Sequence, residues 1–461
     1  MKSLRPLAGL AFALAGIVAV ASETPAYPGY TYVRTLAGIE EYRLDANGLQ
    51  VLVKPDHSAP VATYNITYRV GSRNEVTGTT GATHILEHMM FKGSEHFNDP
   101  AGNSVKQYLE RVGGRYNATT WNDRTHYFAT VGRDSLEGYI AIEADRMRNL
   151  WLRDADRQKE MTVVRNEYER GENDPLQTLE KEVTATAYQA LPYHHDTIGW
   201  RSDIEHVPIE KLREFYDTFY WPDNATAVVI GDVDTGTALA LVRKYYGAIP
   251  RAPKPIPQIY TEEPEQTGPR RTVVKRPGQL GAVVIAHKVP PARSADTPPL
   301  EVLDHILGSG KTSRLYLALV DKGLALSTSA NDSDNRDTGL NTITATLAPG
   351  AKHEAAEQAI LAVLEDIRAN GVTPEEVAIA QRQFHTQFVS GRDGSAAVAR
   401  ELNEWIAAGD WTLYASFPEA IKGVTPADVQ RVAKQYLDQD LSTTGWFVPL
   451  APKGPKAPPA K

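Results

Sequence analysis

Polar and apolar residues alternate in several short stretches of the chain, and this pattern predicts β-strands. Residues 42–53 contain two apolar runs on either side of Asn47-Gly48, a dipeptide typical of tight hairpin turns, so we expect two paired strands there. Residues 61–70 and 125–131 are also rich in apolar and β-branched side chains, and two further strands are predicted there. The first half of the chain should therefore contain a sheet.

Helical spacing of apolar residues occurs between and after these strands. Residues 81–93 place their apolar side chains on one helical face. The sequence Asp134-Ser-Leu-Glu137 matches a capping box and predicts a helix that runs to about residue 152, and another helix is predicted at about residues 154–170. Strands that alternate with helices on this scale are typical of an α/β or α+β domain.

The polar face of the helix at residues 81–93 carries His84, Glu87 and His88 in the order H-x-x-E-H. Residues four apart lie one turn above each other on a helix, so both imidazoles can bind the same metal ion. Zinc with three protein ligands keeps a position for water, and a nearby carboxylate such as Glu87 can accept the proton of that water. The competing interpretation is an ordinary helix that carries these residues by coincidence.

The acid-rich helix at about residues 154–170 is the obvious source of a third ligand. Glu160 and Glu167 are two helical turns apart and share a face. The residues alone leave four candidates open, namely Glu160, Glu167, Glu169 and Glu172.

Two similar halves flank a proline-rich segment. His84-Ile-Leu-Glu-His88 aligns with Glu301-Val-Leu-Asp-His305, and Ile204 aligns with Ile421, so residues 84 and 204 match residues 301 and 421 with the same offset of 217. Equal offsets at both ends indicate an internal duplication, although any two α/β stretches can be brought into rough agreement.

The duplication predicts an α+β fold built from two homologous α/β-sandwich halves. Residues 249–269 are rich in proline and acids and have little apolar periodicity, which is typical of a linker. The predicted organisation is a signal peptide (1–21), an N-terminal zinc-binding domain (22–250), a linker (251–270), a C-terminal domain without the zinc motif (271–450) and a disordered tail (451–461).

The second half lacks the metal-binding pattern. Glu301 replaces the first histidine, and Asp304 and His305 do not make a ligand pair, so we interpret His305 as a structural histidine. Gly308-Ser-Gly-Lys-Thr312 is similar to part of a phosphate-binding loop. That loop requires a glycine at position 305, which is histidine here, so nucleotide binding is excluded.

The first residues have the pattern of a secretory signal peptide. Lys2 and Arg5 precede an apolar run at residues 7–20, and Ala19-Val-Ala21 before Ser22 matches a cleavage site. An uncleaved signal anchor is the alternative, which the shortness of the apolar run disfavours. We therefore expect an exported, periplasmic bacterial protein that does not insert into the membrane after cleavage.

Composition adds three constraints. The chain has no cysteine, so it has neither disulfides nor thiolate ligands. Its 42% of hydrophobic residues is enough to bury two or three domains. A net charge of −8 without a basic stripe argues against nucleic acid as a partner.

The H-x-x-E-H motif, followed by Glu167 at the end of an E-x6-E helix, resembles the M16 metallopeptidases, the family of pitrilysin and the mitochondrial processing peptidases. The resemblance covers nearly the whole mature chain, including the duplication. It extends to three further stretches, Gly113-Gly-Arg-Tyr-Asn-Ala-Thr-Thr120, Ile198-Gly-Trp-Arg-Ser-Asp-Ile204 and Ser313-Arg-Leu315. It implies the duplicated LuxS/MPP-like fold of the half-size members, in which two chains enclose a chamber.

The resemblance also implies roles for individual residues. The ligands of one Zn²⁺ per chain would be His84, His88 and Glu167, with Glu87 as general base and Glu160 orienting the site. Asn117 would lie on the strand against which the substrate backbone adds as a further strand. A turn position for Asn117 is equally consistent with the sequence.

One stretch departs from the family pattern. Active members usually carry an Arg and a Tyr in the second half, in S-R-L-x-x-x-L-R-E-K-x-G-L-A-Y, which hold the substrate and stabilise the oxyanion. Val320 and Leu326 stand at these positions here, while Arg314 and Tyr316 are out of register and are interpreted as structural. A lost oxyanion donor typically costs about 10²–10³ in rate. We therefore expect a heterodimer with a paralogous M16 subunit that supplies the pair, and a homodimer as the other arrangement.

The predicted function is that of a zinc-dependent endopeptidase that hydrolyses peptides or unfolded segments inside a closed chamber. Two alternatives are a non-catalytic peptide-binding or assembly subunit and an exported metal-binding protein without hydrolysis. The complete H-x-x-E-H motif disfavours the first, and Glu87 would have no role in the second.

Overall fold

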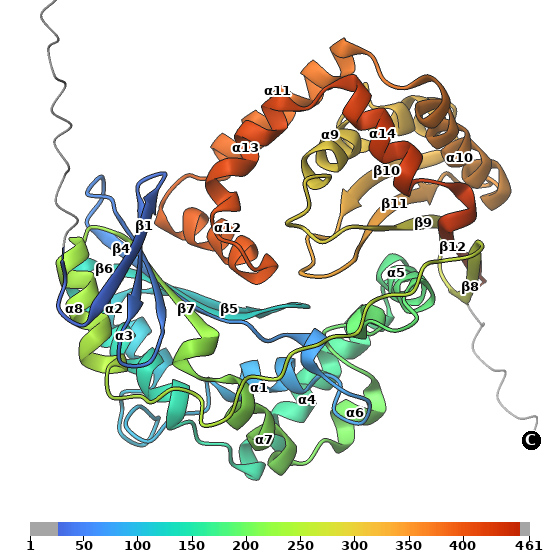
Figure 1. Cartoon of the computed structure of the whole chain (residues 1–461). Coiled ribbons are helices and arrows are strands. Elements are labelled where there is room, and N and C mark those ends of the chain that lie inside the picture. Colours follow the sequence, from blue (N-terminus) through green and yellow to red (C-terminus); the bar gives the residue numbers. More distant parts are fainter. Residues whose placement is uncertain (1–25, 452–461) are drawn as a thin grey trace, which may run out of the picture.

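Two β-sheets, one from each half of the chain, form the framework of the protein (Figure 1). The computed structural model describes residues 26–451. The predicted signal peptide at residues 1–21 lies outside this range, as does the predicted tail from residue 452 onward. The two sheets and the helices that cover them confirm the predicted fold class.

The first sheet has seven strands in the order β1-β2-β3-β7-β4-β6-β5. These strands are β1 (Tyr30–Leu36), β2 (Ile39–Leu44), β3 (Gln50–Pro55), β4 (Val61–Tyr68), β5 (Arg115–Thr120), β6 (Thr125–Gly132) and β7 (Ala225–Gly231). The second sheet has five strands in the order β10-β11-β9-β12-β8. These are β8 (Arg270–Pro277), β9 (Ala282–Val289), β10 (Ala325–Asp332), β11 (Gly339–Leu347) and β12 (Ser442–Leu450). Neighbouring strands are antiparallel except for β3 with β7 and β8 with β12, which are parallel.

Each half also contributes a set of helices. The helices of the first half are α1 (Ala82–Met89), α2 (Val105–Val112), α3 (Leu136–Arg148), α4 (Asp154–Glu172), α5 (Pro175–Ala187), α6 (Arg201–His206), α7 (Ile209–Phe219) and α8 (Thr235–Tyr246). Those of the second half are α9 (Thr297–Gly308), α10 (His353–Asn370), α11 (Pro374–Ser390), α12 (Ser395–Ala408), α13 (Leu413–Gly423) and α14 (Pro426–Tyr436). Within residues 26–451, none of the helices combines the length and apolar character needed to cross a membrane.

The hairpin around Asn47-Gly48 is confirmed, because β2 and β3 pair antiparallel on either side of it and Gly48 has the positive φ of 82° that such a turn requires. The predicted capping box is wrong. Asp134, the predicted cap, lies inside the short helix η2 (Arg133–Ser135), and no side-chain hydrogen bond caps α3. Helix α3 is present but ends at Arg148 rather than near residue 152. Glu137 instead accepts hydrogen bonds from Lys244 at 2.6 Å and from the Tyr245 hydroxyl at 2.8 Å. A partner distant in sequence therefore replaces the local one.

The two halves repeat the same order of elements, which confirms the duplication. The strand order β5-β6-β4-β7-β3 of the first sheet recurs as β10-β11-β9-β12-β8 in the second. Helix α7 spans residues 209–219 and α14 spans residues 426–436, so the offset of 217 holds at both of their ends. The same offset places α9 opposite α1 and α11 opposite α4.

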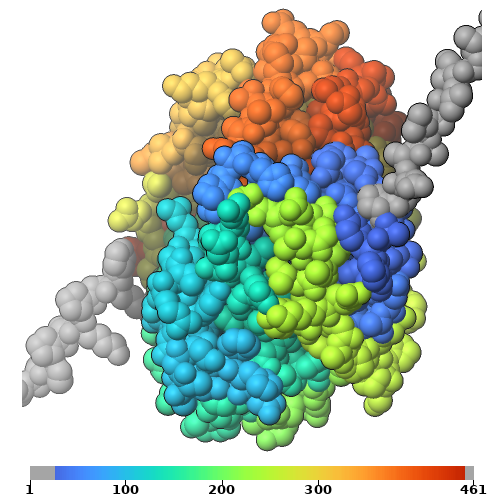
Figure 2. Space-filling model, turned by 90° about the vertical axis from the view of Figure 1, so that its left-hand side faces the viewer, coloured from blue at the N-terminus to red at the C-terminus, as the bar shows by residue number. Residues whose placement is uncertain are grey.

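Each half covers the other half's sheet with one helix. Helix α12 packs on the first sheet and α5 packs on the second, as Figure 1 shows. The apolar contacts under α12 are made by Leu402 and Ile406 with Leu52 and Val228. Those under α5 are made by Leu179 and Val183 with Val284 and Phe447. The exchange binds the halves together, and Figure 2 shows the second half stacked directly on the first.

Residues 251–269, between the halves, contain neither helix nor strand. Glu263 nevertheless fixes this segment to both halves. Its carboxylate accepts hydrogen bonds from the backbone N–H groups of residues 189–191 and from Lys288, at 2.6–3.0 Å.

Candidate metal centre

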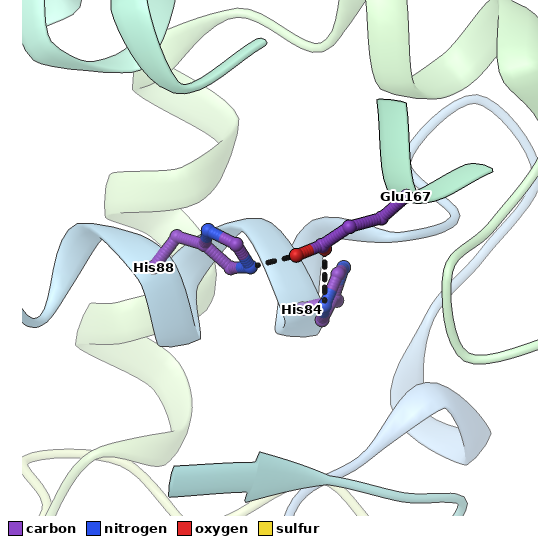
Figure 3. Close-up of side chains that lie close together, drawn as sticks. All are labelled: His84, His88 and Glu167. Atoms are coloured by element: carbon purple, nitrogen blue, oxygen red, sulfur yellow. Dashed lines mark ion pairs between the residues drawn. The ribbon is translucent and has the colours of Figure 1, made fainter. Parts of the chain in front are cut away.

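Two histidines of α1 and a glutamate of α4 point toward one another (Figure 3). The Nε2 atoms of His84 and His88 lie 3.5 Å and 3.4 Å from the same Oε2 atom of Glu167. One possible ligand atom from each residue lies within 4.8 Å of the other two. No other set of three His, Asp or Glu residues in the part of the chain that the structure describes has this geometry. The structure therefore brings the three predicted ligands to one point.

The protonation of these side chains fits a bound cation. Burial and the neighbouring His88 lower the pKa of His84 to about 3, so the His84 imidazole is neutral at pH 7. His88 Nδ1 lies 3.0 Å from Glu160 Oε2, and a proton donated there leaves Nε2 with a free lone pair directed at Glu167. Two imidazole nitrogens and one carboxylate oxygen are the ligand set of zinc sites that keep an open position.

Glu160 holds His88 from the side opposite to the ligand atoms. It is 9% exposed and also forms an ion pair with Lys92. Because both carboxylate oxygens of Glu160 are engaged, the ring of His88 is fixed in tautomer and orientation.

Glu87 lies beside the ligands and is held by the end of β5. The hydroxyl of Thr120 donates a hydrogen bond of 2.7 Å to Glu87 Oε2. Burial raises the pKa of Glu87 above its ordinary value, while the Thr120 hydrogen bond and His88 lower it in part. A carboxyl group with a raised pKa is suited to accept and release a proton near neutral pH.

Glu75 fixes the start of α1. Gly81 precedes this helix with a φ of 83° and has no side chain with which to cap it. The buried carboxylate of Glu75 accepts hydrogen bonds from the backbone N–H groups of Gly81 at 2.8 Å and Thr83 at 2.7 Å. Glu75 was not among the residues predicted from the sequence. The available signal was a helix that begins without Ser, Thr, Asp or Asn and has a glutamate a few residues upstream.

The stretch at residues 198–204 supports the same helix start. Asp203 accepts hydrogen bonds from the backbone N–H of Gly78 at 3.0 Å and the hydroxyl of Thr80 at 2.7 Å. A Cβ atom at Gly81 would lie 2.4 Å from the carbonyl oxygen of Ile198, so this contact requires glycine. Helix α1, which carries the two candidate histidine ligands, is therefore positioned by segments on both sides of it in sequence.

A cavity of about 530 Å³ opens beside the candidate ligands. Its wall includes His84, Thr120, Glu167, Glu172, Lys181 and Asp196. A neighbouring cavity of about 470 Å³ shares Lys181 and Asp196 with it and extends to Trp121 at the tip of the β5–β6 hairpin. The candidate ligands thus face a space large enough for a peptide segment.

The structure separates Glu167 from its competitors on α4. Glu169 lies 3.6 Å from Arg201, and Glu172 forms ion pairs of 2.9 Å with Lys181 and with Arg276. Only Glu160 and Glu167 among the four acids contact the histidines.

Asn117 lies on β5, the edge strand of the first sheet, opposite Phe128 of β6. Its side chain is exposed, and the interpretation of Asn117 as a turn residue is wrong. The edge of β5 that faces away from β6 has no neighbouring strand among the described residues.

The stretch that departs from the family pattern supplies no donor to this site. Arg314 forms ion pairs with Glu376 at 2.7 Å and Asp366 at 2.9 Å within the second half, as the structural interpretation expects. Val320 ends the short helix η5 (Tyr316–Val320), and Leu326 is 54% exposed on the edge strand β10.

Comparisons with known proteins show the family of this chain. The family profile "Insulinase (Peptidase family M16)" matches residues 50–199, and "Peptidase M16 inactive domain" matches residues 206–384. A protein of Helicobacter pylori named zinc protease PqqE is 31% identical over 408 residues, which are 87% of this chain and 91% of the relative. The chain belongs to the M16 peptidase family. A probable beta subunit of the mitochondrial-processing peptidase of Arabidopsis thaliana is 25% identical over 410 residues, or 86% of this M16 chain and 76% of the relative.

Solved structures of M16 proteins have the same duplicated fold. The crystal structure of a protease from Helicobacter pylori is similar with a TM-score of 0.83 and 30% identity, and the match covers 91% of this chain and 99% of that one. The first half of the periplasmic protease PqqL from Escherichia coli shares the fold, with a TM-score of 0.73 and 18% identity over 91% of this chain and 93% of that one.

Proposed function

We propose that this chain is a zinc-dependent M16 endopeptidase that hydrolyses peptides or unfolded segments. The observation that carries the proposal is the convergence of His84, His88 and Glu167 on one point beside a separately held Glu87. Relatives named zinc protease support the same activity. One Zn²⁺ per chain is proposed because one ligand set is present among residues 26–451.

The three ligand residues would hold Zn²⁺, which when bound supplies a Lewis acid and lowers the pKa of a coordinated water. Glu87 would accept a proton from the attacking water at its free carboxylate oxygen and pass it to the leaving amine. Thr120 keeps the other oxygen of Glu87 in place during this transfer. Glu160 keeps His88 oriented by holding its Nδ1 proton.

The edge of β5 offers a binding surface for an extended substrate. A peptide that pairs with this edge as a further strand would lie next to Asn117 and run toward Thr120, whose hydroxyl contacts Glu87. Main-chain hydrogen bonds of this kind bind many sequences, so unfolded segments are the proposed substrates.

A partner subunit is proposed because neither Val320 nor Leu326 can donate a side-chain hydrogen bond to an oxyanion. A paralogous M16 chain that supplies the Arg and Tyr would complete the site in a closed chamber. Addition of that partner is expected to raise the hydrolysis rate by about 10²–10³. An equal rate with and without it would overturn the heterodimer and leave the zinc site untouched.

The test of the catalytic proposal is cleavage of a quenched fluorescent peptide by the purified mature chain and its partner, with and without a chelator. Glu87→Gln is expected to lower the rate about 10²–10⁴-fold while the chain keeps its zinc. The matched control is Glu110→Gln on α2. In the described structure the single ion pair of Glu110 is the 3.8 Å contact with Lys106. Zinc binding without any chelator-sensitive hydrolysis would instead indicate a binding or assembly subunit.

Export to the periplasm of a bacterium is proposed from the residues before Ser22. The measurement is the N-terminal sequence of the protein recovered from the periplasm, which should begin at Ser22. An intact N-terminus in a membrane fraction would favour the signal anchor.

A further inference from the structure

A second cavity on the first sheet takes no part in the mechanism proposed above. It has a volume of about 340 Å³ and shares no wall residue with the cavity beside His84. Residues of β1, β2 and β3 and the residue after β4 form one side, and the turn between α12 and α13 at residues 409–412 forms the other. We call it the arginine cavity, because Arg34, Arg43 and Arg69 line it.

The floor of the arginine cavity is a network of hydrogen bonds around a buried carboxylate. Glu41 accepts hydrogen bonds from Trp411 at 2.9 Å and from Gln50 at 2.7 Å. The same carboxylate lies 3.1 Å from Nε of Arg34. Glu41 is 5% exposed and Trp411 is 4% exposed, so this network is closed from below. Both oxygens of Glu41 are occupied, and the floor offers no free carboxylate to a cation.

The guanidinium of Arg69 is held on one side and open on the other. Its Nη2 donates to the amide oxygen of Gln50 at 2.8 Å and to the hydroxyl of Thr226 at 2.6 Å. Its Nε and Nη1 have no hydrogen-bond partner among residues 26–451, and neither is sealed from solvent. Burial and the charges of Arg336 and Arg43 lower the pKa of Arg69 to about 10. Arg69 therefore offers free N–H groups to the cavity, at a point where positive charge is poorly compensated.

Further arginines surround the same cavity. The side chain of Arg43 has no hydrogen bond or ion pair in the part of the chain that the structure describes. A Cβ atom at Gly48 of the wall would lie 3.6 Å from the guanidinium carbon of Arg251. One at Gly409 would lie 3.9 Å from Nη1 of Arg293. Five arginines thus line or adjoin the cavity, and two positive charges remain after its three acids are counted, namely Glu41, Asp223 and Asp410.

The other two acids of the wall already accept hydrogen bonds. Asp223 accepts from the backbone N–H of Ala252 at 3.1 Å and lies 3.5 Å from Nε of Arg251. Asp410 accepts from the backbone N–H of Thr412 at 2.9 Å and from its hydroxyl at 2.6 Å. The unpaired groups of this cavity are therefore mainly donors, and a ligand that brings acceptor oxygens would satisfy them.

We propose that the arginine cavity binds a small dianionic oxyanion, either a phosphate group or a dicarboxylate. The planar guanidinium donates two parallel hydrogen bonds to a pair of oxygens on one atom, and both anions have such pairs. Arg69 and Arg43 would supply these donors, and the two remaining positive charges match a dianion. Ile406 is the one aliphatic side chain of the wall, so a ligand with a long apolar chain is a poor occupant.

A bound anion would connect the two halves of the chain. Arg43 and Arg69 belong to the first half, whereas residues 409–412 follow α12, the helix of the second half that packs on the first sheet. A ligand that binds only the folded chain stabilises it by mass action. Binding should therefore raise the Tm of the protein. The inference does not depend on peptide hydrolysis, because the cavity contains none of the candidate metal ligands.

The test is isothermal titration calorimetry of the full chain with inorganic phosphate and, separately, with malonate. The protein is first freed of metal by a chelator and dialysed, so that neither anion can bind to zinc. Sodium chloride at about 0.15 M screens scattered surface charges. We expect one site per chain, a dissociation constant below about 1 mM for at least one anion, and a higher Tm in its presence. The anion that binds more tightly identifies the chemistry of the ligand.

Three variants locate the binding site. Arg69→Lys keeps the charge but loses the planar fork, and should weaken binding about tenfold. Arg43→Gln removes a charged donor and should also weaken binding about tenfold. Asp410→Asn removes a wall carboxylate and should tighten binding a few-fold. The matched control is Arg382→Gln, an exposed arginine of α11 without a side-chain contact in the described structure, which should leave the affinity unchanged.

The opposite signs of these effects keep the test decisive. If Arg69→Lys does not fold, Arg43→Gln and Asp410→Asn still probe the cavity, because both change exposed side chains at its rim. The inference would be overturned if neither anion gave a saturable signal up to about 10 mM. It would also be overturned if Arg43→Gln left the affinity unchanged, or if Arg382→Gln lowered it equally, since binding would then be an adventitious attraction to surface charge.

Discussion

Helices α1 and α9 hold equivalent places in the two halves, yet they carry opposite chemistry. Each packs against a second helix, α4 or α11, beside the edge strand of its sheet. In the first half, His84 and Glu167 converge on one point. In the second half, Glu301 and Phe384 take these places, and His305 alone remains of the motif. The fold thus positions a helix pair and a cavity in each half, while a few side chains decide whether candidate metal ligands line that cavity.

The interfaces under the two exchanged helices, α5 and α12, also differ at equivalent positions. Under α5, Gly445 of β12 lets the helix approach so closely that a Cβ atom there would lie 2.3 Å from Val183. The equivalent position under α12 is Val228, which fills the contact with its own side chain. The two interfaces therefore have the same topology but different spacing.

The largest effect is expected from Glu160, whose counterpart in the second half is Val377. Glu160→Gln keeps the shape of the side chain but removes the charge that holds His88 Nδ1 and Lys92. We expect zinc affinity to fall about 10–100-fold, as measured by competition with a chromophoric chelator. Glu169→Gln on the same helix should leave the affinity unchanged, because Glu169 contacts Arg201 and not the histidines. Unchanged affinity in Glu160→Gln would mean that the orientation of His88 is set by packing alone.

A smaller effect is expected from Gly445→Val, which gives the second half the residue that the first half has. The new side chain would overlap Val183 and Leu179, and the helix α5 would have to move away from the sheet. We expect the free energy of unfolding in urea to fall by about 1–3 kcal/mol. Gly423→Ala, where a Cβ atom meets nothing within 4 Å, is the control. A neutral result in Gly445→Val would show that α5 shifts without loss of packing.

The sequence predicted those features that depend on neighbours in the chain. The helix spacing of His84 and His88 is local, and so is the Asn47-Gly48 turn. The duplication could be predicted because two halves with one fold repeat the same order of apolar segments at a constant offset. Residues close in sequence thus determined the elements and two of the three candidate ligands.

The features that the sequence did not predict depend on contacts between distant segments. The choice of Glu167 among four acids follows from how α4 packs on α1, and only the family resemblance indicated it beforehand. Glu75 acts on a helix start through backbone groups, and the missing cap residue before α1 was the one sequence signal for it. The capping box at Glu137 failed for the same reason, since Lys244 lies far along the chain.

The smallest effect concerns the interface under α12, which is more polar than that under α5. His126 of β6 is 2% exposed at this interface, near Arg124 and Arg400, and burial lowers its pKa to about 3. An unfolded histidine has a pKa of about 6.5, so the unfolded chain takes up this proton first as the pH falls. The contribution of neutral His126 to stability is therefore complete above about pH 6.5 and is lost toward pH 3, at about 1.4 kcal/mol per pH unit.

Replacement of His126 by glutamine should remove this part of the acid sensitivity. The free energy of unfolding is measured in urea at pH 7.5 and at pH 5.5. The difference between these two values is expected to be about 1 kcal/mol smaller in His126→Gln than in the wild type. His57→Gln is a control of opposite sign, because the hydrogen bond with Asp232 raises the pKa of the exposed His57 and favours its charged form in the fold. If His126→Gln leaves the difference unchanged, other buried groups such as His287, whose pKa burial lowers to about 4, account for the loss of stability in acid. That result would assign the acid sensitivity to the second sheet rather than to the interface under α12, since His287 lies on β9.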